Sequence, residues 1–354
     1  MSGGFADMLK SMEDSSLQHL AAKVPSWAGH SLELPSSLNF QQCSGESAAR
    51  YKASIVPEGS RVADLTGGLG VDSWAFSLRA SAVWYNEREV VLLGAVKRNF
   101  ADLGVSGVVF NGYDISLSDS AWLDSLRSFA PDVIYLDPAR RDAAGRKVFL
   151  LEDCSPDVVA LMPLLLEVAS LVIVKVSPMA DLTMLQRRLA GWLSELHVVG
   201  ADGECKELLC ICRAASLKSS VRVVLAEDGF VLGGIRPESA ERSETQAEAL
   251  LFVPSAAMVK SGLGAGIGMM GYDEELAHFG KYYEVIDNLP FASSQLKELR
   301  KCWPQAEITA KGVRLSSEEL RTKMKIKPGG PIHIFACVLN GDRRMLVCRR
   351  FVKL

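Results

Sequence analysis

Residues 61–70 read Arg-Val-Ala-Asp-Leu-Thr-Gly-Gly-Leu-Gly: a strand-like start, then Asp64, then a glycine turn that leads into a helix-like run from Ser73. Glycines allow the chain to turn tightly and let a ligand approach main-chain N–H groups. A second acid, Glu87, follows 23 residues after Asp64, where the next strand is expected to end. The segment therefore predicts a nucleotide-like ligand at the carboxyl edge of a parallel sheet.

Two kinds of cofactor compete for such a turn. The dinucleotide fingerprint requires glycine or alanine three residues after its second glycine, where this chain has Ser73. The pattern Asp-x-x-x-Gly-x-Gly resembles instead the first motif of class I S-adenosylmethionine methyltransferases, whose second acid binds the ribose hydroxyls. A strand-to-helix turn without any ligand is the remaining interpretation.

Strands and helices alternate from residue 62 to residue 194. Acids at positions 64, 87, 114 and 137 each close a predicted strand, at spacings of 23, 27 and 23 residues. This rhythm predicts an α/β fold with a doubly wound, Rossmann-like parallel sheet. The segment His197–Arg213 departs from it and reads as a hairpin that turns at Asp202-Gly203. A terminal antiparallel hairpin is characteristic of class I methyltransferases, and dehydrogenases lack it.

The chain is expected to divide into four regions. A helical extension covers residues 1–45, and the Rossmann-like domain covers residues 46–216. A small α+β region, compatible with a ferredoxin-like fold, is expected at 217–290, with Leu251–Lys260 as one of its helices. A basic α+β domain is expected at 291–354.

Composition places the chain among ordinary globular proteins. Of its 354 residues, 48% are hydrophobic and 23% are charged, and no apolar run reaches the 18 residues of a membrane span. Met1–Ser15 carries three acids and does not resemble a signal peptide. Eight scattered cysteines without a Cys-x-x-Cys pair argue against a zinc site and predict a cytoplasmic protein.

Charge is distributed unevenly along the chain. From Lys311 to Leu354 there are eleven basic and three acidic residues, a net charge of +8, which leaves −11 for the rest of a chain whose total is −3. Such asymmetry favours a polyanionic partner for the C-terminal region. A solvated basic face, or a basic tail on an acidic body, would give the same count.

The segment Asp137-Pro138-Ala139-Arg140-Arg141 ends the fourth predicted strand, beside the place where methyltransferases transfer the methyl group. Enzymes that methylate exocyclic amino groups have Asp/Asn-Pro-Pro and then an aromatic residue, and Arg140 replaces that aromatic here. The Asp-Pro-x-Arg form is closer to the 5-methyluridine RNA methyltransferases. Their cysteine nucleophile is missing from the corresponding turn, 175–179, which argues against covalent attack on the pyrimidine.

The combined set resembles bacterial class I S-adenosylmethionine methyltransferases with a C-terminal THUMP-like domain. The resemblance spans most of the chain except about 45 N-terminal residues. THUMP domains bind RNA, so it implies a structural RNA substrate, tRNA or rRNA. It is carried by segments 47–52, 64–72, 137–141, 175–179 and 204–207, and by 307–312, 315–320 and 325–330 in the tail.

The resemblance and the strand ends together assign roles to single residues. Asp64, Gly68 and Gly70 are expected to bind the methionine end of the cofactor. Glu87 is expected to bind its ribose, and Asp114 with Tyr113 its adenine. The full cofactor set is Asp64, Thr66, Gly68, Gly70, Asp72, Glu87, Tyr113, Asp114 and Asp137. The catalytic set is Asp137, Pro138, Arg140 and Lys175, and the substrate-binding set is Arg140, Arg141, Lys311, Lys325 and Lys327.

Asp137 is expected to accept a proton or hydrogen bond from the target atom. Arg140, Arg141 and Lys175 could hold a substrate phosphate, or could instead pair with acids at 152, 153 and 157 on the same sheet edge. No metal site is predicted.

The sequence therefore predicts an S-adenosylmethionine-dependent RNA methyltransferase. Its rivals are a non-catalytic RNA-binding protein with a degenerate methyltransferase fold, a protein or small-molecule methyltransferase, and a nicotinamide dehydrogenase. Intact acids at 64, 87 and 137 argue against the first, the +8 tail against the second, and Ser73 with the 197–213 hairpin against the third.

Overall fold

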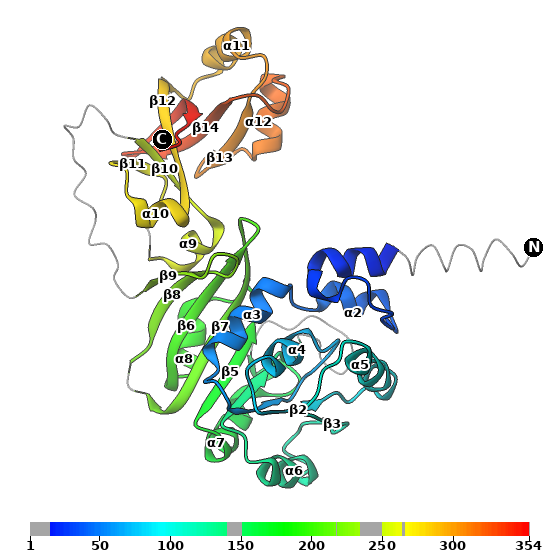
Figure 1. Cartoon of the computed structure of the whole chain (residues 1–354). Helices are drawn as coiled ribbons and strands as arrows, with labels where there is room; N and C mark the ends of the chain where they lie inside the picture. Colours follow the sequence, from blue (N-terminus) through cyan, green and yellow to red (C-terminus); the bar gives the residue numbers. More distant parts are fainter. Residues whose placement is uncertain (1–14, 140–150, 217, 234–249, 264–265, 354) are drawn as a thin grey trace, which may run out of the picture. The chain divides into compact units, whose positions relative to one another are not determined.

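A computed structural model describes residues 15–139, 151–216, 218–233, 250–263 and 266–353. The chain forms two compact units, Met1–Gly233 and Gly234–Leu354, and each is described by itself (Figure 1). Within the described residues, no helix is long and apolar enough to cross a membrane.

The first unit is built on a nine-stranded sheet of order β3-β2-β1-β4-β5-β7-β6-β8-β9, and it confirms the predicted α/β fold (Figure 1). The first five strands of this order, β3, β2, β1, β4 and β5, all pair in parallel. The strands are β1 (Arg61–Asp64), β2 (Ala82–Asn86), β3 (Val108–Asn111), β4 (Val133–Leu136), β5 (Leu171–Val176), β6 (Gly191–Ala201), β7 (Glu204–Ser216), β8 (Ser220–Leu225) and β9 (Phe230–Gly233). The helices between them are α4 (Val71–Ser77), α5 (Val90–Asp102), α6 (Ala121–Phe129), α7 (Val158–Val168), α8 (Leu182–Arg188) and the short η2 (Leu151–Asp153).

The register brings the ends of the central strands level. Asp64 at the end of β1 pairs with Tyr85 of β2 on one side and with Tyr135 of β4 on the other. The residues that follow β2 and β4, Glu87 and Asp137, consequently emerge at the same edge as the glycine turn. The strand interiors are apolar and buried on both faces, as is typical of parallel strands between layers of helices.

The predicted hairpin at 197–213 is present and longer than expected. Strand β7 pairs antiparallel with both β5 and β6, so Val176 of β5 lies opposite Leu208. This pairing brings Glu207, which begins the buried part of β7, to the strand edge that carries Asp137.

Residues 217–290 do not form one region. Strands β8 and β9 extend the first sheet, with β8 parallel to β6, because Val223 and Val224 are completely buried there. The later part of the segment belongs to the second unit.

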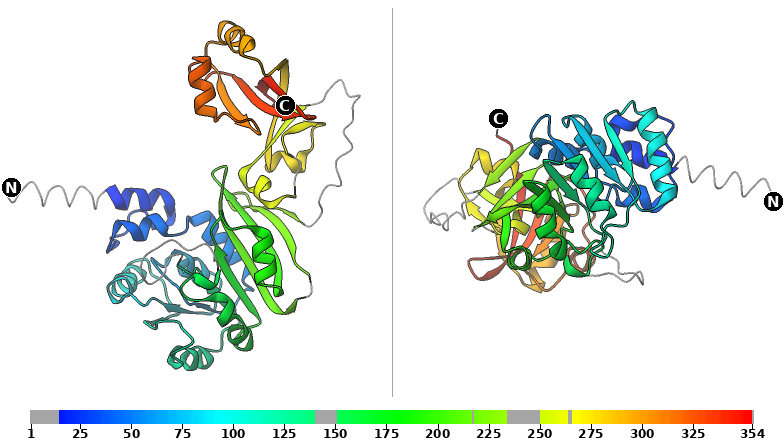
Figure 2. Two further views of the ribbon diagram at one scale, coloured as in Figure 1. Left: turned by 180° about the vertical axis from the view of Figure 1, so that it is seen from behind. Right: turned by 90° about the horizontal axis from the view of Figure 1, so that it is seen from below.

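The N-terminal extension packs on the first unit near α4 and α5, as both views show (Figures 1 and 2). It contains a helix that includes residues 15–23, η1 (Pro25–Trp27) and α2 (Ser37–Gln42), and α3 (Glu46–Ile55) follows it. Trp27 meets Trp74 of α4 edge to face at 5.9 Å, and Glu33 forms two 2.6 Å hydrogen bonds with Arg98 of α5. The extension is therefore part of the core of this unit.

The second unit contains a six-stranded sheet of order β11-β10-β12-β15-β14-β13. Leu251–Lys260 is not the single helix expected from its sequence: the apolar run pairs with β12 as a strand, and Ser255 caps a separate helix after Pro254. The strands are β10 (Leu250–Pro254), β11 (Gly268–Met270), β12 (Gly280–Pro290), β13 (Glu307–Lys311), β14 (Ile332–Leu339) and β15 (Asp342–Arg350). The helices are α9 (Ala256–Ser261), α10 (Glu274–His278), α11 (Ser293–Cys302) and α12 (Ser317–Met324).

Candidate methyl-transfer site

A cavity of about 1390 Å³ opens at the carboxyl edge of the first sheet. The glycine turn is defined here as residues 64–70; its residues 65–70 form one wall, and Glu87, Tyr113 and Asp114 continue it. Asp137, Pro138 and Lys175 line the other side. The strand-end acids at 87, 114 and 137 are thus brought to one cavity, whereas Asp64 lies behind its wall.

The glycine turn has no room for side chains at two positions. A Cβ on Gly67 would lie 2.1 Å from the ring of Tyr85, and one on Gly70 would lie 2.8 Å from the ring of Phe100. Gly70 also has a φ of +86°, the left-handed region that favours glycine, at the N-cap of α4. Steric contacts therefore require glycine at positions 67 and 70, and the backbone conformation favours glycine at position 70 as well.

Gly68 is the position that faces open space. Its Cβ would meet nothing closer than 4.0 Å, so the backbone here can be approached by a ligand. The main-chain N–H of Gly68 donates to Glu87 at 3.0 Å, and that of Glu89 donates to the other carboxylate oxygen of Glu87 at 2.8 Å. Burial raises the pKa of Glu87, and these two N–H groups oppose that rise.

Asp64 supports the turn from behind. Its side chain is fully buried, accepts the hydroxyl of Ser73 at 2.6 Å and accepts the N–H of Thr66 at 3.1 Å. Burial raises the pKa of Asp64 to about 7, and the charge of Asp72 adds to the rise. These two hydrogen bonds let the carboxylate of Asp64 fix the conformation of the turn.

Tyr113 and Asp114 extend the cavity wall beyond β3. The side-chain amide of Asn86 donates to the carbonyl of Tyr113 at 3.0 Å and accepts its N–H at 2.8 Å, which fixes this backbone. The rings of Tyr113 and Trp84 are parallel within 5°, at 6.1 Å. Asp114 is exposed and lies 3.4 Å from Arg88.

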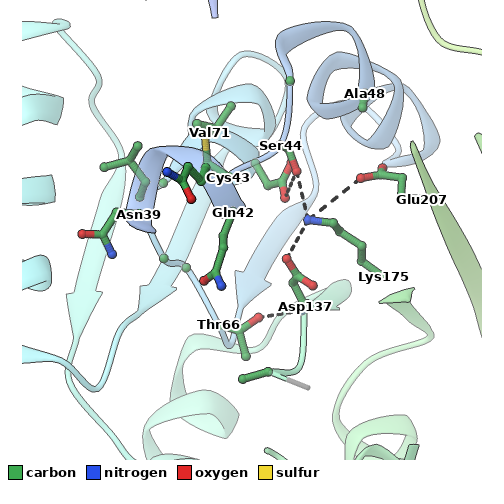
Figure 3. A pocket seen from close by; sticks show the side chains of 18 of the residues that line it. Asn39, Gln42, Cys43, Ser44, Ala48, Thr66, Val71, Asp137, Lys175 and Glu207 are labelled. Atoms are coloured by element: carbon green, nitrogen blue, oxygen red, sulfur yellow. Dashed lines mark hydrogen bonds and ion pairs between the residues drawn. The ribbon is translucent and has the colours of Figure 1, made fainter. Parts of the chain in front are cut away.

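A lysine cluster forms the opposite side of the cavity. It is defined here as Lys52, Lys175 and the carboxylates Asp72, Asp137 and Glu207, and Figure 3 shows Lys175 between two of these acids and Ser44. Lys175 Nζ lies 2.6 Å from Asp137 Oδ2 and 4.0 Å from Glu207 Oε2. Burial by itself lowers the pKa of Lys175, but Asp137, Glu207 and Asp72 more than reverse this, so the lysine stays an ammonium.

Lys52 stands behind this pair and is completely buried. It donates to both oxygens of Glu207, at 2.7 and 2.9 Å, and lies 3.0 Å from Asp72. Asp72 also accepts the hydroxyls of Tyr135 at 2.7 Å and Ser44 at 2.9 Å. Burial raises the pKa of Asp72, but the charges of Lys52 and Lys175 and the hydrogen bond from Tyr135 together hold it below its usual value. Paired in this way, the buried charges meet the condition under which burial is tolerated.

One hydrogen bond links the lysine cluster to the glycine turn. The main-chain N–H of Asp137 donates to Thr66 Oγ1 at 2.6 Å (Figure 3). The carbonyl of Tyr135 also accepts the N–H of Leu65 at 3.0 Å. A group bound over the turn therefore lies next to the Asp137–Lys175 pair.

The structure describes some of the remaining expected site residues and not others. Arg140 and Arg141 fall outside the described residues. Lys311, Lys325 and Lys327 belong to the second unit, on or near β13 and α12. Asp72 lines the cavity and is held within the lysine cluster by Lys52.

Sequence reasoning missed Lys52, Glu207, Ser44 and Tyr135. Lys52 carried a usable signal, since it lies on the same helical stripe as Ala48, Ala49 and Ala53, and a lysine on a buried face requires a buried acid. Ser44 stood outside the expected domain. Within the described ranges, no group of three or more His, Cys, Asp or Glu side chains could hold a metal ion.

Comparisons with known proteins show what this chain is similar to. The family described as "THUMP domain-like" matches residues 280–350. The crystal structure of a "putative methyltransferase" from Porphyromonas gingivalis W83 is 30% identical, with a TM-score of 0.83, over 96% of this chain and 89% of that one. No curated protein matches the chain.

Two more distant structures cover about half of this chain. An rRNA methylase from Streptococcus thermophilus is 14% identical, over 48% of this chain and 95% of its own, with a TM-score of 0.34. A precorrin-6y C5,15-methyltransferase from Geobacter metallireducens GS-15 is 13% identical, over 48% and 87%, with a TM-score of 0.33. They are too distant to bear on function.

Fold and site define a class I methyltransferase. The chain belongs to the S-adenosylmethionine methyltransferases that carry a THUMP-like domain at the C-terminal end, as the 30% identical structure and the match at 280–350 establish.

Proposed function

We propose that this protein transfers a methyl group from S-adenosylmethionine to a structural RNA, tRNA or rRNA, in the cytoplasm. The observation that carries the proposal is one cavity that joins an open glycine turn with its acid, Glu87, to the Asp137–Lys175 pair.

The residues fit the cofactor. Each oxygen of Glu87 accepts one main-chain N–H and retains a lone pair for a ribose hydroxyl. The empty space over Gly68 is where a side chain would block a ligand, and none is present. When bound, the cofactor would supply an electrophilic methyl group on a positively charged sulfur.

The RNA substrate is supported by the second unit. It contains the THUMP-like segment and a net charge of +8 over residues 311–354. Basic surfaces gain affinity for polyanions by releasing counterions, so RNA binding should weaken steeply with salt.

Calorimetry with S-adenosylmethionine and S-adenosylhomocysteine tests the cofactor. Glu87→Gln should lose tenfold to a hundredfold in affinity, because a hydrogen bond to a charged group contributes about 1.5–3 kcal/mol. Glu58→Gln, an exposed acid outside the cavity, is the matched control.

Transfer of a labelled methyl group to RNA from a strain that lacks the gene tests the substrate. The proposal expects label in one RNA class. Only full-length protein that binds the cofactor should transfer the label. Cofactor binding without any labelled RNA would contradict the RNA assignment, and no cofactor binding would favour a non-catalytic RNA-binding protein.

A further inference from the structure

We propose that the atom methylated is a hydroxyl oxygen, which in RNA is the ribose 2′-hydroxyl. The inference rests on the proposed function for the RNA and the methyl donor, and it adds the target atom.

Two groups face the part of the cavity where transfer would occur, the carboxylate of Asp137 and the ammonium of Lys175, and they contact each other. Asp137 is 38% exposed and Lys175 is 14% exposed, whereas Glu207 and Lys52 are 4% and 0% exposed. A substrate can therefore reach the Asp137–Lys175 pair, while the other members of the lysine cluster hold that pair from behind.

Lys175 is fixed in place. Ser44 Oγ accepts from its ammonium at 3.3 Å, Asp137 at 2.6 Å, and Glu207 lies at 4.0 Å. Lys52 holds Glu207 in a two-pronged contact, so the carboxylate cannot swing toward Lys175 without losing a buried partner. The direction in which Lys175 presents its N–H groups is consequently set by the fold.

The ammonium distinguishes between target atoms. An amino group that attacks a methyl cation equivalent gains positive charge on nitrogen, and a neighbouring ammonium disfavours that. A hydroxyl oxygen gains reactivity as negative charge builds on it, and a hydrogen bond from an ammonium stabilises that charge. The Asp137–Lys175 pair thus fits an alcohol and opposes an amine.

The step balances with the groups present. The hydroxyl oxygen, hydrogen-bonded by Lys175, attacks the methyl carbon of the sulfonium donor. The O–C bond forms while the C–S bond breaks, and the electron pair of that bond remains on sulfur as a thioether. The hydroxyl proton passes to the carboxylate of Asp137, which retains acceptor capacity beside Lys175, and then to water.

The cavity has room for this substrate. Ligand pockets for single small molecules span about 300–1000 Å³, and this one is about 1390 Å³. A cofactor over the glycine turn leaves space for a nucleotide beside Asp137 and Pro138. The aromatic residue that stacks on a base in enzymes with the Asp/Asn-Pro-Pro-aromatic motif is replaced in this sequence by Arg140.

Mapping the label tests the inference. The full-length protein would methylate RNA from a strain that lacks the gene, and the labelled RNA would be digested to nucleosides. The inference expects the methyl group on ribose, with the adjacent linkage resistant to alkali. Label on a base would overturn the inference and leave the proposed function standing; no labelled RNA despite cofactor binding would overturn both.

A 2′-deoxy substitution at the mapped nucleotide gives a second readout that needs no variant. Binding of the deoxy RNA to the protein with S-adenosylhomocysteine should change less than threefold, while transfer should disappear. Undiminished transfer to the deoxy RNA would contradict the inference.

Protein variants separate chemistry from binding. Lys175→Met and Asp137→Asn should each lower the transfer rate by 10²–10³-fold while S-adenosylhomocysteine affinity changes less than threefold. Lys218→Met and Asp228→Asn, both exposed, are the matched controls and should leave both quantities unchanged. Transfer rates within threefold of wild type for both site variants would sink the assigned roles.

Discussion

The two sides of the cavity are built in opposite ways. The glycine turn comes from one short segment and presents main-chain N–H groups, with Glu87 only 19 residues from Gly68. The lysine cluster presents side chains, and Lys52 meets Glu207 across 155 residues. The turn depends on backbone conformation, whereas the cluster depends on two lysines that offset the charge of three carboxylates.

This difference predicts how each side fails. A change in the turn should alter packing and cofactor affinity by moderate amounts. Removing one charge from the lysine cluster leaves a buried ion without its partner, which is among the costliest single changes in a protein. The following variants measure that contrast.

Lys52→Met should give the largest loss of stability, about 3–5 kcal/mol, because the buried Glu207 and Asp72 would lose their closest cation. Arg50→Met, on the same helix but in an exposed pair with Glu46, should cost about 1 kcal/mol or less. Denaturant unfolding measures both. Equal losses would show that the cluster is not held by its charges.

Stability should depend on pH through Asp64. Its pKa is raised to about 7 in the folded chain, so the folded state keeps a proton that the unfolded state loses near pH 4. Its contribution is therefore full below pH 4 and falls as the pH rises to 7, by at most about 4 kcal/mol.

Asp64→Asn removes this dependence and can still bond Ser73 and Thr66. The stability of Asp64→Asn relative to wild type should therefore rise between pH 5 and pH 8, as followed by chemical denaturation. A constant difference across that range would mean that Asp64 is charged in the fold.

Gly70→Ala should cost about 2–4 kcal/mol, from the left-handed backbone and from the clash with Phe100. Gly104→Ala shares a positive φ, at +68°, but has open space around its Cβ, and should cost about 1–2 kcal/mol. The difference between their unfolding free energies isolates the packing term. If the two are alike, the turn does not need the close contact.

The smallest effect is expected in the second unit. Lys325→Gln together with Lys327→Gln should weaken RNA binding severalfold and reduce the slope of log affinity against log salt by about 1–2, one for each lost phosphate contact. Lys301→Gln, already paired with Glu298, should leave the slope unchanged. An unaltered slope in the double variant would place the RNA on other residues.

Sequence patterns predicted the parts of this protein that are local. The glycine turn, the spacing of the strand-end acids and the terminal hairpin each depend on residues within about 25 positions, and together they gave the correct fold class. The helix expected at Leu251–Lys260 was wrong because an apolar run before Pro254 suits a strand equally well, and only its pairing with β12 decides.

The lysine cluster could not be predicted in the same way. Its members come from α3, the start of α4 and the ends of β4, β5 and β7, and no spacing in the sequence encodes their contact. Lys175 and Asp137 were singled out by position, but their contact with each other was not predicted. Asp64 was expected to face the cofactor, and its burial behind the turn depends on Ser73, which the motif alone does not reveal.

A crystal structure with S-adenosylhomocysteine tests the central claim most directly. The ribose hydroxyls should lie within about 2.6–3.2 Å of the Glu87 carboxylate, and the sulfur should lie between Thr66 and the Asp137–Lys175 pair. Density for the compound elsewhere, or a blank cavity at millimolar concentration, would contradict the account.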